Sequence, residues 1–155
     1  MTEFRGRLVP VGRIGVVVSA YHERITSKLL DGALTTCRAA GIAETDIDVA
    51  WVPGAFELGA VAAAMARSRR YAALVALGAV VRGDTPHFDF VAGEASRVLA
   101  DVAAAHLPVG FGLLTVDTMA QAVERAGGAA GNKGAEAADA AIRAADLITQ
   151  LNQKA

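Results

Sequence analysis

The chain is poor in the features that define several common protein classes. Its single cysteine, Cys37, excludes an internal disulfide and fits a reducing compartment such as the cytoplasm. Only 20% of residues are charged and the formal net charge is −1, which gives no support for binding nucleic acid or an anionic membrane. The longest apolar run, residues 71–81, is too short to span a bilayer, and residues 1–13 have no apolar signal-peptide core. We therefore expect a soluble cytoplasmic protein.

Standard cofactor and catalytic motifs are also missing. The glycine-rich stretch 127–134 does not match the phosphate-loop pattern GxxxxGK[ST], because Asn132 precedes Lys133. No GxGxxG follows a predicted strand, and the chain has no GxSxG. One cysteine and three scattered histidines give no recognisable spacing of metal ligands. These absences predict a protein without a metal or a dinucleotide cofactor.

Apolar residues, in contrast, are abundant. They make up 54% of the 155 residues, much of the excess being alanine, and the mean hydropathy is +0.38. This length suffices for one domain with a sizeable core, so we predict a single domain over residues 1–155, of which 1–12 form an N-terminal arm. The low charge content indicates that partner subunits cover some apolar surface.

Strand and helix patterns alternate along the chain. Short apolar strands are predicted at 14–19, 47–52, 72–81 and 109–115, and helices at 23–40, 56–67, 88–105, 119–125 and 132–151. This order predicts a three-layer α/β/α fold, flavodoxin-like, with a four-stranded parallel sheet flanked by helices. Residues 127–134 are predicted to form a kink between two helices. Phe4, Leu8 and Val11 predict an extra strand, on the edge of this sheet or of a neighbouring subunit's sheet.

The most informative motif, RGDTPH at 82–87, follows the third predicted strand, and ligands of open parallel sheets bind beyond such strand ends. Thr85 suits the cap of the following helix and Pro86 its first position. Free backbone N–H groups at a helix start attract phosphate. His87 falls in the first turn, where a neutral imidazole can accept and return a proton. The alternative is a structural or surface histidine.

Other strand ends carry further candidates, each with two interpretations. Tyr21 and Phe56 are either ordinary packing residues or a stacking surface for a flat heterocycle. Glu57 complements a helix start in any case, and it could also accept hydrogen bonds from a polyol. His22 is a ligand contact or a surface residue. Arg125, in the last turn of a short helix, complements the helix dipole or binds phosphate in a bidentate manner.

Four motifs in order resemble the lumazine synthase family: VPGAFE at 52–57, GAVVRGDTPHFD at 78–89, QAVERAG at 121–127 and GNKG at 131–134. The likeness runs from about residue 14 to the final helix. It implies a transferase of riboflavin biosynthesis, 6,7-dimethyl-8-ribityllumazine synthase. Such an enzyme condenses 5-amino-6-(D-ribitylamino)uracil with 3,4-dihydroxy-2-butanone 4-phosphate and releases phosphate and water. The resemblance implies no metal or redox cofactor.

The resemblance also implies roles for individual residues. His87 would transfer protons, and Arg125 would clamp the phosphate, with Lys133 a basic residue nearby or at the surface. Backbone N–H groups of Gly83, Asp84 and Thr85 would contact the same phosphate. In the family, Phe111 and Arg125 come from the adjacent subunit. The pyrimidine and ribityl site would comprise Tyr21, His22, Ala55, Phe56, Glu57, Ala79, Val80, Val81 and Phe111.

The resemblance further implies a homo-oligomer with active sites between adjacent subunits. Family members form pentamers, and some form a sixty-subunit icosahedral shell that can associate with riboflavin synthase. The bend at 127–132 has the length found in shell formers, which favours a shell with a pentamer as the minimum. Two other interpretations remain open: a non-catalytic flavin- or lumazine-binding protein, and a cage-forming paralogue without catalysis.

Overall fold

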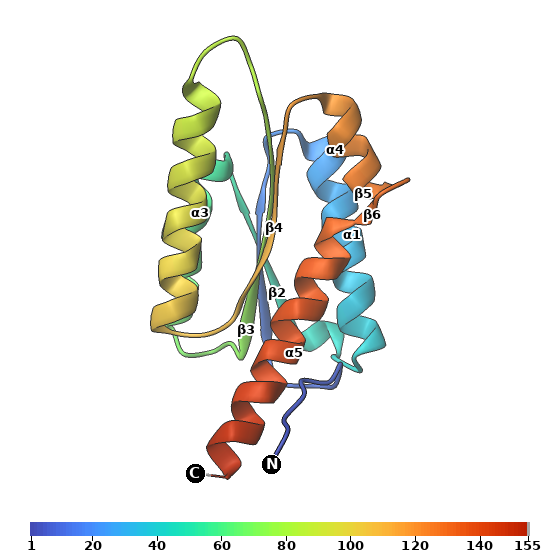
Figure 1. Ribbon diagram of the computed structural model, residues 1–155, viewed down its shortest axis with the longest axis vertical. Helices are drawn as coiled ribbons and strands as arrows, with labels where there is room; N and C mark the ends of the chain where they lie inside the picture. The colour runs from blue at the N-terminus through green and yellow to red at the C-terminus, as the bar shows by residue number, and fades with distance from the viewer. Residues whose placement is uncertain (155) are drawn as a thin grey trace.

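A four-stranded parallel sheet is the middle layer of the computed structural model, which describes residues 1–154 (Figure 1). The strands lie in the order β2-β1-β3-β4, and Val17 of β1 pairs with Ala50 of β2 and Ala76 of β3. Every residue of β1 is buried, because helices cover both faces of the sheet, and its sequence is therefore apolar without alternation. The strand bounds are β1 Ile14–Ser19, β2 Ile47–Val52, β3 Ala73–Val81 and β4 Val109–Val116.

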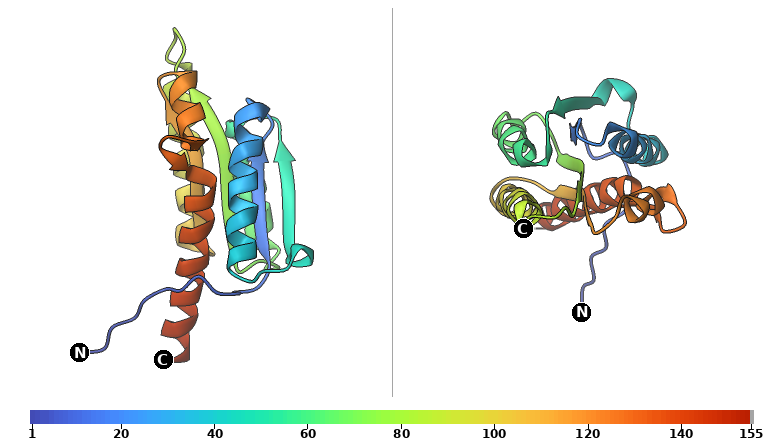
Figure 2. Two further views of the ribbon diagram at one scale, coloured as in Figure 1. Left: turned by 90° about the vertical axis from the view of Figure 1, so that its right-hand side faces the viewer. Right: turned by 90° about the horizontal axis from the view of Figure 1, so that it is seen from above.

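Helices form the two outer layers. Seen from above, α1 (Glu23–Ala39) and α5 (Lys133–Gln153) lie on one side of the sheet, and α2 (Leu58–Arg67) and α3 (His87–Ala105) lie on the other (Figure 2). The short α4 (Met119–Arg125) precedes α5, and η1 (Glu44–Asp46) and η2 (Ala55–Glu57) are single 3₁₀ turns. The predicted three-layer α/β/α fold of flavodoxin type is confirmed. Within residues 1–154, no helix combines the length and the hydrophobicity needed to cross a bilayer.

Alternate residues of β1 serve two cores. Val16 packs with α1 and α5, and Val17 packs with α2 and α3, because successive side chains of a strand point to opposite faces. Two glycines let α5 approach its neighbours: a Cβ at Gly110 would collide with the carbonyl of Ala137, and one at Gly134 with backbone atoms of α1. Backbone contact at these points holds α5 tightly against the sheet and against α1.

The prediction of a kink at 127–134 is wrong, because a small antiparallel hairpin lies there. Its strands are β5 (Ala126–Gly128) and β6 (Gly131–Asn132). Gly127 and Gly131 adopt φ values of 98° and 82°, which side chains disfavour, and this allows the tight reversal. The Asn132 side chain then accepts hydrogen bonds from the N–H groups of Gly134 and Ala135 at 2.9 and 3.0 Å, so that α5 begins at Lys133.

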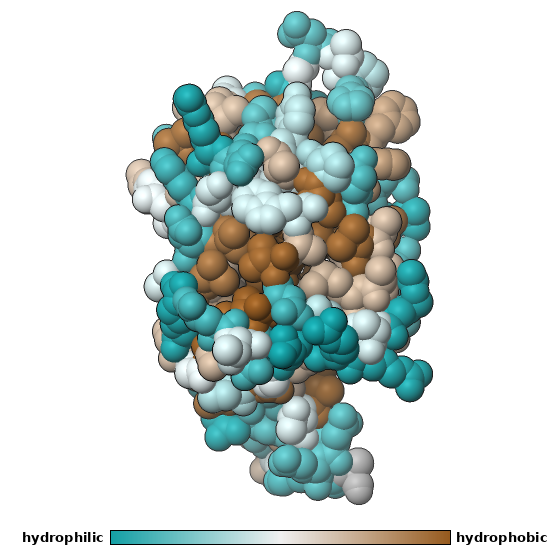
Figure 3. All heavy atoms as spheres, turned by 180° about the vertical axis from the view of Figure 1, so that it is seen from behind, coloured by the Kyte–Doolittle hydropathy of each residue, from teal (hydrophilic) through white to brown (hydrophobic). Residues whose placement is uncertain are grey.

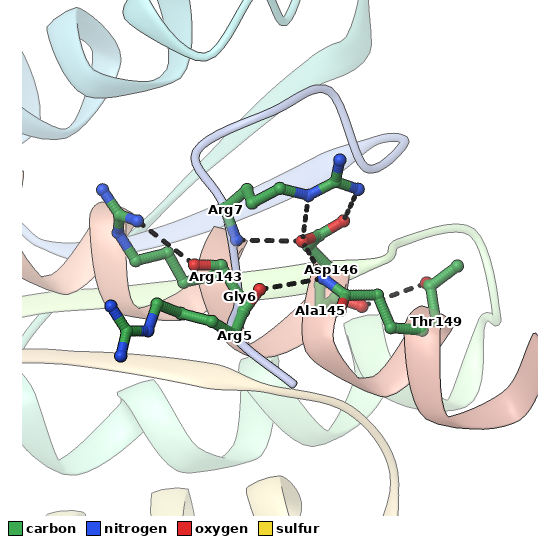
Figure 4. Close-up of polar contacts among 8 residues, drawn as sticks. Arg5, Gly6, Arg7, Arg143, Ala145, Asp146 and Thr149 are labelled. Carbon is green, nitrogen blue, oxygen red and sulfur yellow. Dashed lines mark hydrogen bonds and ion pairs between the residues drawn. The ribbon is translucent and has the colours of Figure 1, made fainter. Parts of the chain in front are cut away.

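The N-terminal arm does not add a strand to the chain's own sheet in the described residues, contrary to one expectation. It instead follows the last turns of α5 (Figure 4). The backbone N–H, Nε and Nη2 of Arg7 donate to the buried carboxylate of Asp146 at 2.9, 3.1 and 3.0 Å. Gln150 Nε2 bridges that carboxylate and the carbonyl of Arg5 at 2.7 and 2.9 Å.

These contacts have an electrostatic consequence. The Arg7 side chain, helped by its backbone N–H and by Gln150, lowers the pKa of Asp146 to about 2 despite burial. An ionised carboxylate thus joins the arm to α5. The N-terminal arm and the end of α5 lie at the end of the molecule where the strands begin (Figure 1).

Candidate active site

A cavity of ≈ 770 Å³ opens at the carboxyl ends of the strands, where open parallel sheets bind their ligands. Its volume falls within the range of about 300–1,000 Å³ that is typical of small-molecule sites. The contributing segments are the turns after β1, β2 and β3, the last residues of β3, the first turns of α3 and the first residue of α4. The lining residues are Tyr21, His22, Gly54, Ala55, Phe56, Glu57, Ala79, Val80, Val81, Gly83, Thr85, His87, Phe88, Phe90, Val91 and Met119.

Three aromatic side chains in this lining are unusually exposed, with Phe90 at 69%. Tyr21 is 65% exposed and Phe56 61%, although both border a cavity with an apolar wall. The ring of His22 meets that of Tyr21 edge to face, with centroids 4.6 Å apart. His22 has a left-handed backbone (φ 58°), an uncommon conformation for a residue with a side chain, and its carbonyl accepts the first hydrogen bonds of α1. The turn therefore presents flat apolar faces beside an imidazole.

The end of β3 and the η2 turn complete this wall. Ala79 is buried, and Val80 and Val81 are half-buried at the end of the strand, so backbone and small side chains face the cavity. The Glu57 carboxylate lies over Gly54, where a Cβ would come 3.2 Å from Oε2. The exposed carboxylate can accept hydrogen bonds from a hydroxylated ligand.

The loop between β3 and α3 forms the polar side. Gly83, Thr85 and His87 line the cavity, and Asp84 is exposed beside them but outside the lining. The helix starts at His87, one residue earlier than predicted, and Pro86 takes the cap position. Thr85 Oγ1 still accepts a long hydrogen bond, 3.5 Å, from the N–H of His87. The N-terminal end of α3 thus faces the cavity beside an exposed imidazole, an arrangement suited to an anion and a proton donor or acceptor.

Arg82, at the base of this loop, contacts three segments. Its Nε donates to Asp117 Oδ1 at 3.0 Å, in the turn after β4, and its Nη1 lies 3.4 Å from Asp89 Oδ1 in the first turn of α3. The guanidinium carbon lies 4.3 Å from the ring centroid of Phe88. The hydrogen bond to Asp117, more than the nearby charges, raises the pKa of Arg82 above its ordinary value.

Three predicted site residues lie away from the cavity of their own chain. Phe111 is 52% exposed on the edge strand β4. Arg125 Nη1 donates to the carbonyl of Gln121 at 3.1 Å, and Lys133 Nζ pairs with Glu136 at 2.7 Å. Among the described residues, the lining therefore contains no lysine or arginine.

Sequence reasoning missed five lining residues: Gly54, Phe88, Phe90, Val91 and Met119. A signal existed for two of them. Phe88 and Phe90 follow His87 directly in a chain with only 5% aromatic residues, and Phe90 is 69% exposed. Met119 begins α4 behind a capping box between Thr118 and Gln121, at a strand end for which no residue had been singled out.

The described residues offer organic rather than metal chemistry. Within residues 1–154, no group of three or more His, Cys, Asp or Glu side chains could hold a metal ion. Cys37 is fully buried, and burial raises the pKa of its thiol, which makes it a poor nucleophile. The chemical groups at the cavity are imidazole, phenol, hydroxyl, carboxylate and backbone N–H.

A family model for 6,7-dimethyl-8-ribityllumazine synthase matches residues 12–149. The matched region covers most of the 155 residues, including the whole sheet and every segment that lines the cavity. The chain belongs to the lumazine synthase family. Membership assigns it, in general terms, to lumazine synthesis in riboflavin biosynthesis and to transferase enzymes. It also implies small-molecule substrates and assembly into an oligomer.

Proposed function

We propose that the protein condenses 5-amino-6-(D-ribitylamino)uracil with 3,4-dihydroxy-2-butanone 4-phosphate to give 6,7-dimethyl-8-ribityllumazine, phosphate and water. One observation carries the proposal: exposed aromatic rings and the loop bearing His87 line a single cavity, in a chain of the lumazine synthase family. The aromatic rings suit a flat heterocycle. The loop with His87 suits a phosphorylated ketone that must gain and lose protons.

The pyrimidine substrate occupies the apolar side in this proposal. Tyr21 and Phe56 stack on the ring, and the end of β3, from Ala79 to Val81, contacts its edge. Glu57 accepts hydrogen bonds from the ribityl hydroxyls, with Ala55 beside it. His22 contacts either the ribityl group or the pyrimidine ring. Stacking and hydrogen bonding together would fix the ring so that its amine faces the second substrate.

The phosphate of the second substrate lies at the start of α3, held by backbone N–H groups of Gly83, Asp84 and Thr85. Arg125 of a neighbouring subunit supplies the clamping charge, with Lys133 as an additional basic residue and Phe111 closing the pocket. The absence of lysine and arginine from the lining of a single described chain supports a donated cation. Among residues 1–154, Arg125 is held only by a backbone carbonyl and a 3.7 Å ion pair with Glu124, contacts that a phosphate can replace.

Catalysis in this proposal combines positioning with proton transfer. The amine attacks the ketone carbonyl, and loss of water gives an imine. His87 then takes a proton from the carbon next to the imine, and the electron pair forms a carbon–carbon double bond as phosphate leaves. Return of the proton to the terminal carbon of the resulting enol gives a methyl ketone. The ribitylamino nitrogen attacks this carbonyl, and loss of water closes the ring. The clamp and helix start stabilise charge on the departing phosphate. Holding both substrates together can contribute on the order of 7–11 kcal/mol, so His87 is a secondary contributor.

Assembly completes the proposed site. The back of the molecule has a hydrophobic area (Figure 3), and the edge strand β2 exposes Val49 and Trp51 at 39% and 46%. An exposed apolar strand edge needs a partner. We propose a pentamer, extended to an icosahedral shell, in which residues 1–12 of one subunit add a strand to a neighbour's sheet. Light scattering distinguishes the two sizes.

The decisive experiment mixes both substrates with the purified protein and follows lumazine fluorescence. A rate well above the spontaneous reaction supports the proposal. A rate equal to the spontaneous one, in a correctly assembled protein, would favour a flavin-binding or cage-forming paralogue. Equilibrium binding of the lumazine product then separates these two alternatives, because only the former binds it.

A further inference from the structure

We propose that Arg82 is a positioning residue, which holds the loop that carries His87 in register with the turn after β4. The inference rests on the proposed function, because it concerns the geometry of that same site. Arg82 belongs to the motif at 82–87, but neither the sequence pattern nor the pocket lining gives it a role.

The contacts of Arg82 reach both sides of the cavity's polar wall. Its backbone N–H donates to the carbonyl of Val116 at 2.9 Å, and its side chain continues to Asp117 at 3.0 Å. Met119, which lines the cavity, lies two residues beyond Asp117. On the other side, the guanidinium covers the ring of Phe88, the residue after His87 and itself part of the lining.

A single planar guanidinium therefore links the end of β3, the first turn of α3 and the turn after β4. Its geometry matters because Arg offers a flat face to Phe88 and, at its edge, donors to Asp117 and Asp89 at once. Lysine has a positive charge but neither the flat face nor the fork of donors. The arrangement thus predicts that charge alone will not replace Arg82.

Stability does not explain this cluster. The side chains of Arg82, Asp117 and Asp89 are 48%, 68% and 61% exposed, and exposed ion pairs contribute little to the free energy of unfolding. Loop geometry is more sensitive, since a displacement of about 1 Å at a catalytic group can lower a rate about 100-fold. The contacts of Arg82 should therefore affect turnover much more than melting temperature.

The same geometry predicts which substrate is affected. Arg82 contacts the first turn of α3 and the turn after β4, where the phosphate side lies. Among the described residues, none of its polar or ring contacts involves Tyr21 or Phe56. Loss of Arg82 should therefore lower kcat and raise KM for the phosphorylated ketone. The KM for the pyrimidine should stay unchanged.

The test compares Arg82→Met with a matched control, Arg97→Met. Arg97 lies on α3 and is 60% exposed. It also pairs with two carboxylates, Glu94 at 2.9 Å and Asp101 at 3.0 Å, but it lies outside the cavity lining. We expect Arg82→Met to lower kcat/KM for the phosphorylated ketone about tenfold or more, whereas Arg97→Met stays within about twofold of the parent. Both variants should melt at similar temperatures.

Two further variants keep the test informative if Arg82→Met folds poorly. Asp117→Asn removes one partner and should produce part of the same defect, and Arg82→Lys should recover little of the lost kcat. The double variant Arg82→Met/Asp117→Asn should be no slower than Arg82→Met alone, since both remove one interaction. Kinetic constants for Arg82→Met and Asp117→Asn that match those of Arg97→Met would overturn the inference. An inactive parent protein would instead overturn the proposed function.

Discussion

Polar and aromatic side chains lie at both ends of the sheet, but they are bonded to one another at one end and exposed at the other. Where the strands begin, Asp48 accepts hydrogen bonds from Arg13 at 3.0 Å, Arg70 at 3.2 Å and the Tyr71 hydroxyl at 2.8 Å. Where the strands end, Tyr21 and His87 stand exposed at the border of a cavity, and neither side chain is bound by a partner from another element in the described residues. Polar and aromatic groups satisfied by one another maintain a fold, whereas those left available around a hollow can act on a ligand.

The carboxyl and phenol groups with perturbed pKa values lie at the end where the strands begin, not at the cavity. The hydrogen bond from Tyr71, more than the nearby arginines, lowers the pKa of Asp48, and burial together with Asp48 raises the pKa of Tyr71. These shifts come from ion pairing and packing far from the cavity. A shifted pKa therefore indicates a site only when a cavity and a reacting group accompany it.

The largest expected effect is that of Arg125→Ala. If the cavity is completed by a neighbour's guanidinium, this change should lower kcat/KM for the phosphorylated ketone about 100- to 1,000-fold, as expected when a group that stabilises developing charge is lost. The pyrimidine KM should change little. Steady-state lumazine fluorescence measures both, with Arg38→Ala, which pairs with Glu44 at the surface, as the control. Unchanged use of the phosphorylated ketone would exclude the clamp.

His87→Ala should have the next largest effect. Because positioning contributes most of the rate enhancement, we expect kcat to fall by at most about 100-fold, the low end for general acid–base groups. Light scattering must first establish that the variant assembles like the parent protein. Complete loss of activity in an assembled variant would contradict a secondary role for the imidazole.

The fold and most of the cavity could be predicted from the sequence, but the surroundings of Arg125 could not. All four strands were predicted to within one residue, because each is a short, mostly apolar run bounded by turn residues, with Asp48 the one charged residue among them. The loops that line the cavity followed from the strand-end rule, which requires only topology. The proposed place of Arg125 and Phe111 in a neighbouring subunit's site came only from the resemblance to the family, because the described chain does not bring either residue to its own cavity.

Two local features escaped prediction for physical reasons. The hairpin β5–β6 depends on left-handed glycines at 127 and 131, and composition alone does not distinguish such a hairpin from a flexible bend. Phe88 and Phe90 line the cavity because of how α3 is rotated about its axis. That rotation is fixed only when α3 packs on the sheet. The role of the arm was equally ambiguous, since an apolar segment can pair with a sheet or lie on a helix.

Asp146→Asn tests the ion pairs at the end of the molecule where the strands begin. The pKa of Asp146 falls from 3.8 to about 2 on folding, so the ionised carboxylate stabilises the native state above pH about 4, and this contribution is lost as pH falls towards 2. The melting temperature of Asp146→Asn should therefore lie below that of the parent at pH 7. The gap should narrow between pH 4 and pH 2. A gap independent of pH would show that the charge is irrelevant.

The smallest effect is expected for Asp48→Asn. The side chain of Asp48 is 36% exposed, so losing its charge should lower the melting temperature only slightly, again with a difference that shrinks as pH falls below the ordinary range of a carboxyl pKa. Kinetic constants should equal those of the parent. A change in kcat would contradict the division into a structural end and a functional end, because Asp48 would then influence the cavity across the sheet.

The positions of the N-terminal arm and of the end of α5 have a practical consequence. Both lie on the side where the strands begin, and the final turns of α5 extend past the sheet (Figure 1), away from the loops that border the cavity. An affinity tag or fluorophore appended after α5 would therefore sit remote from the entrance. Attachment to a sensor surface through that tag should leave the entrance accessible to ligands arriving from bulk solution.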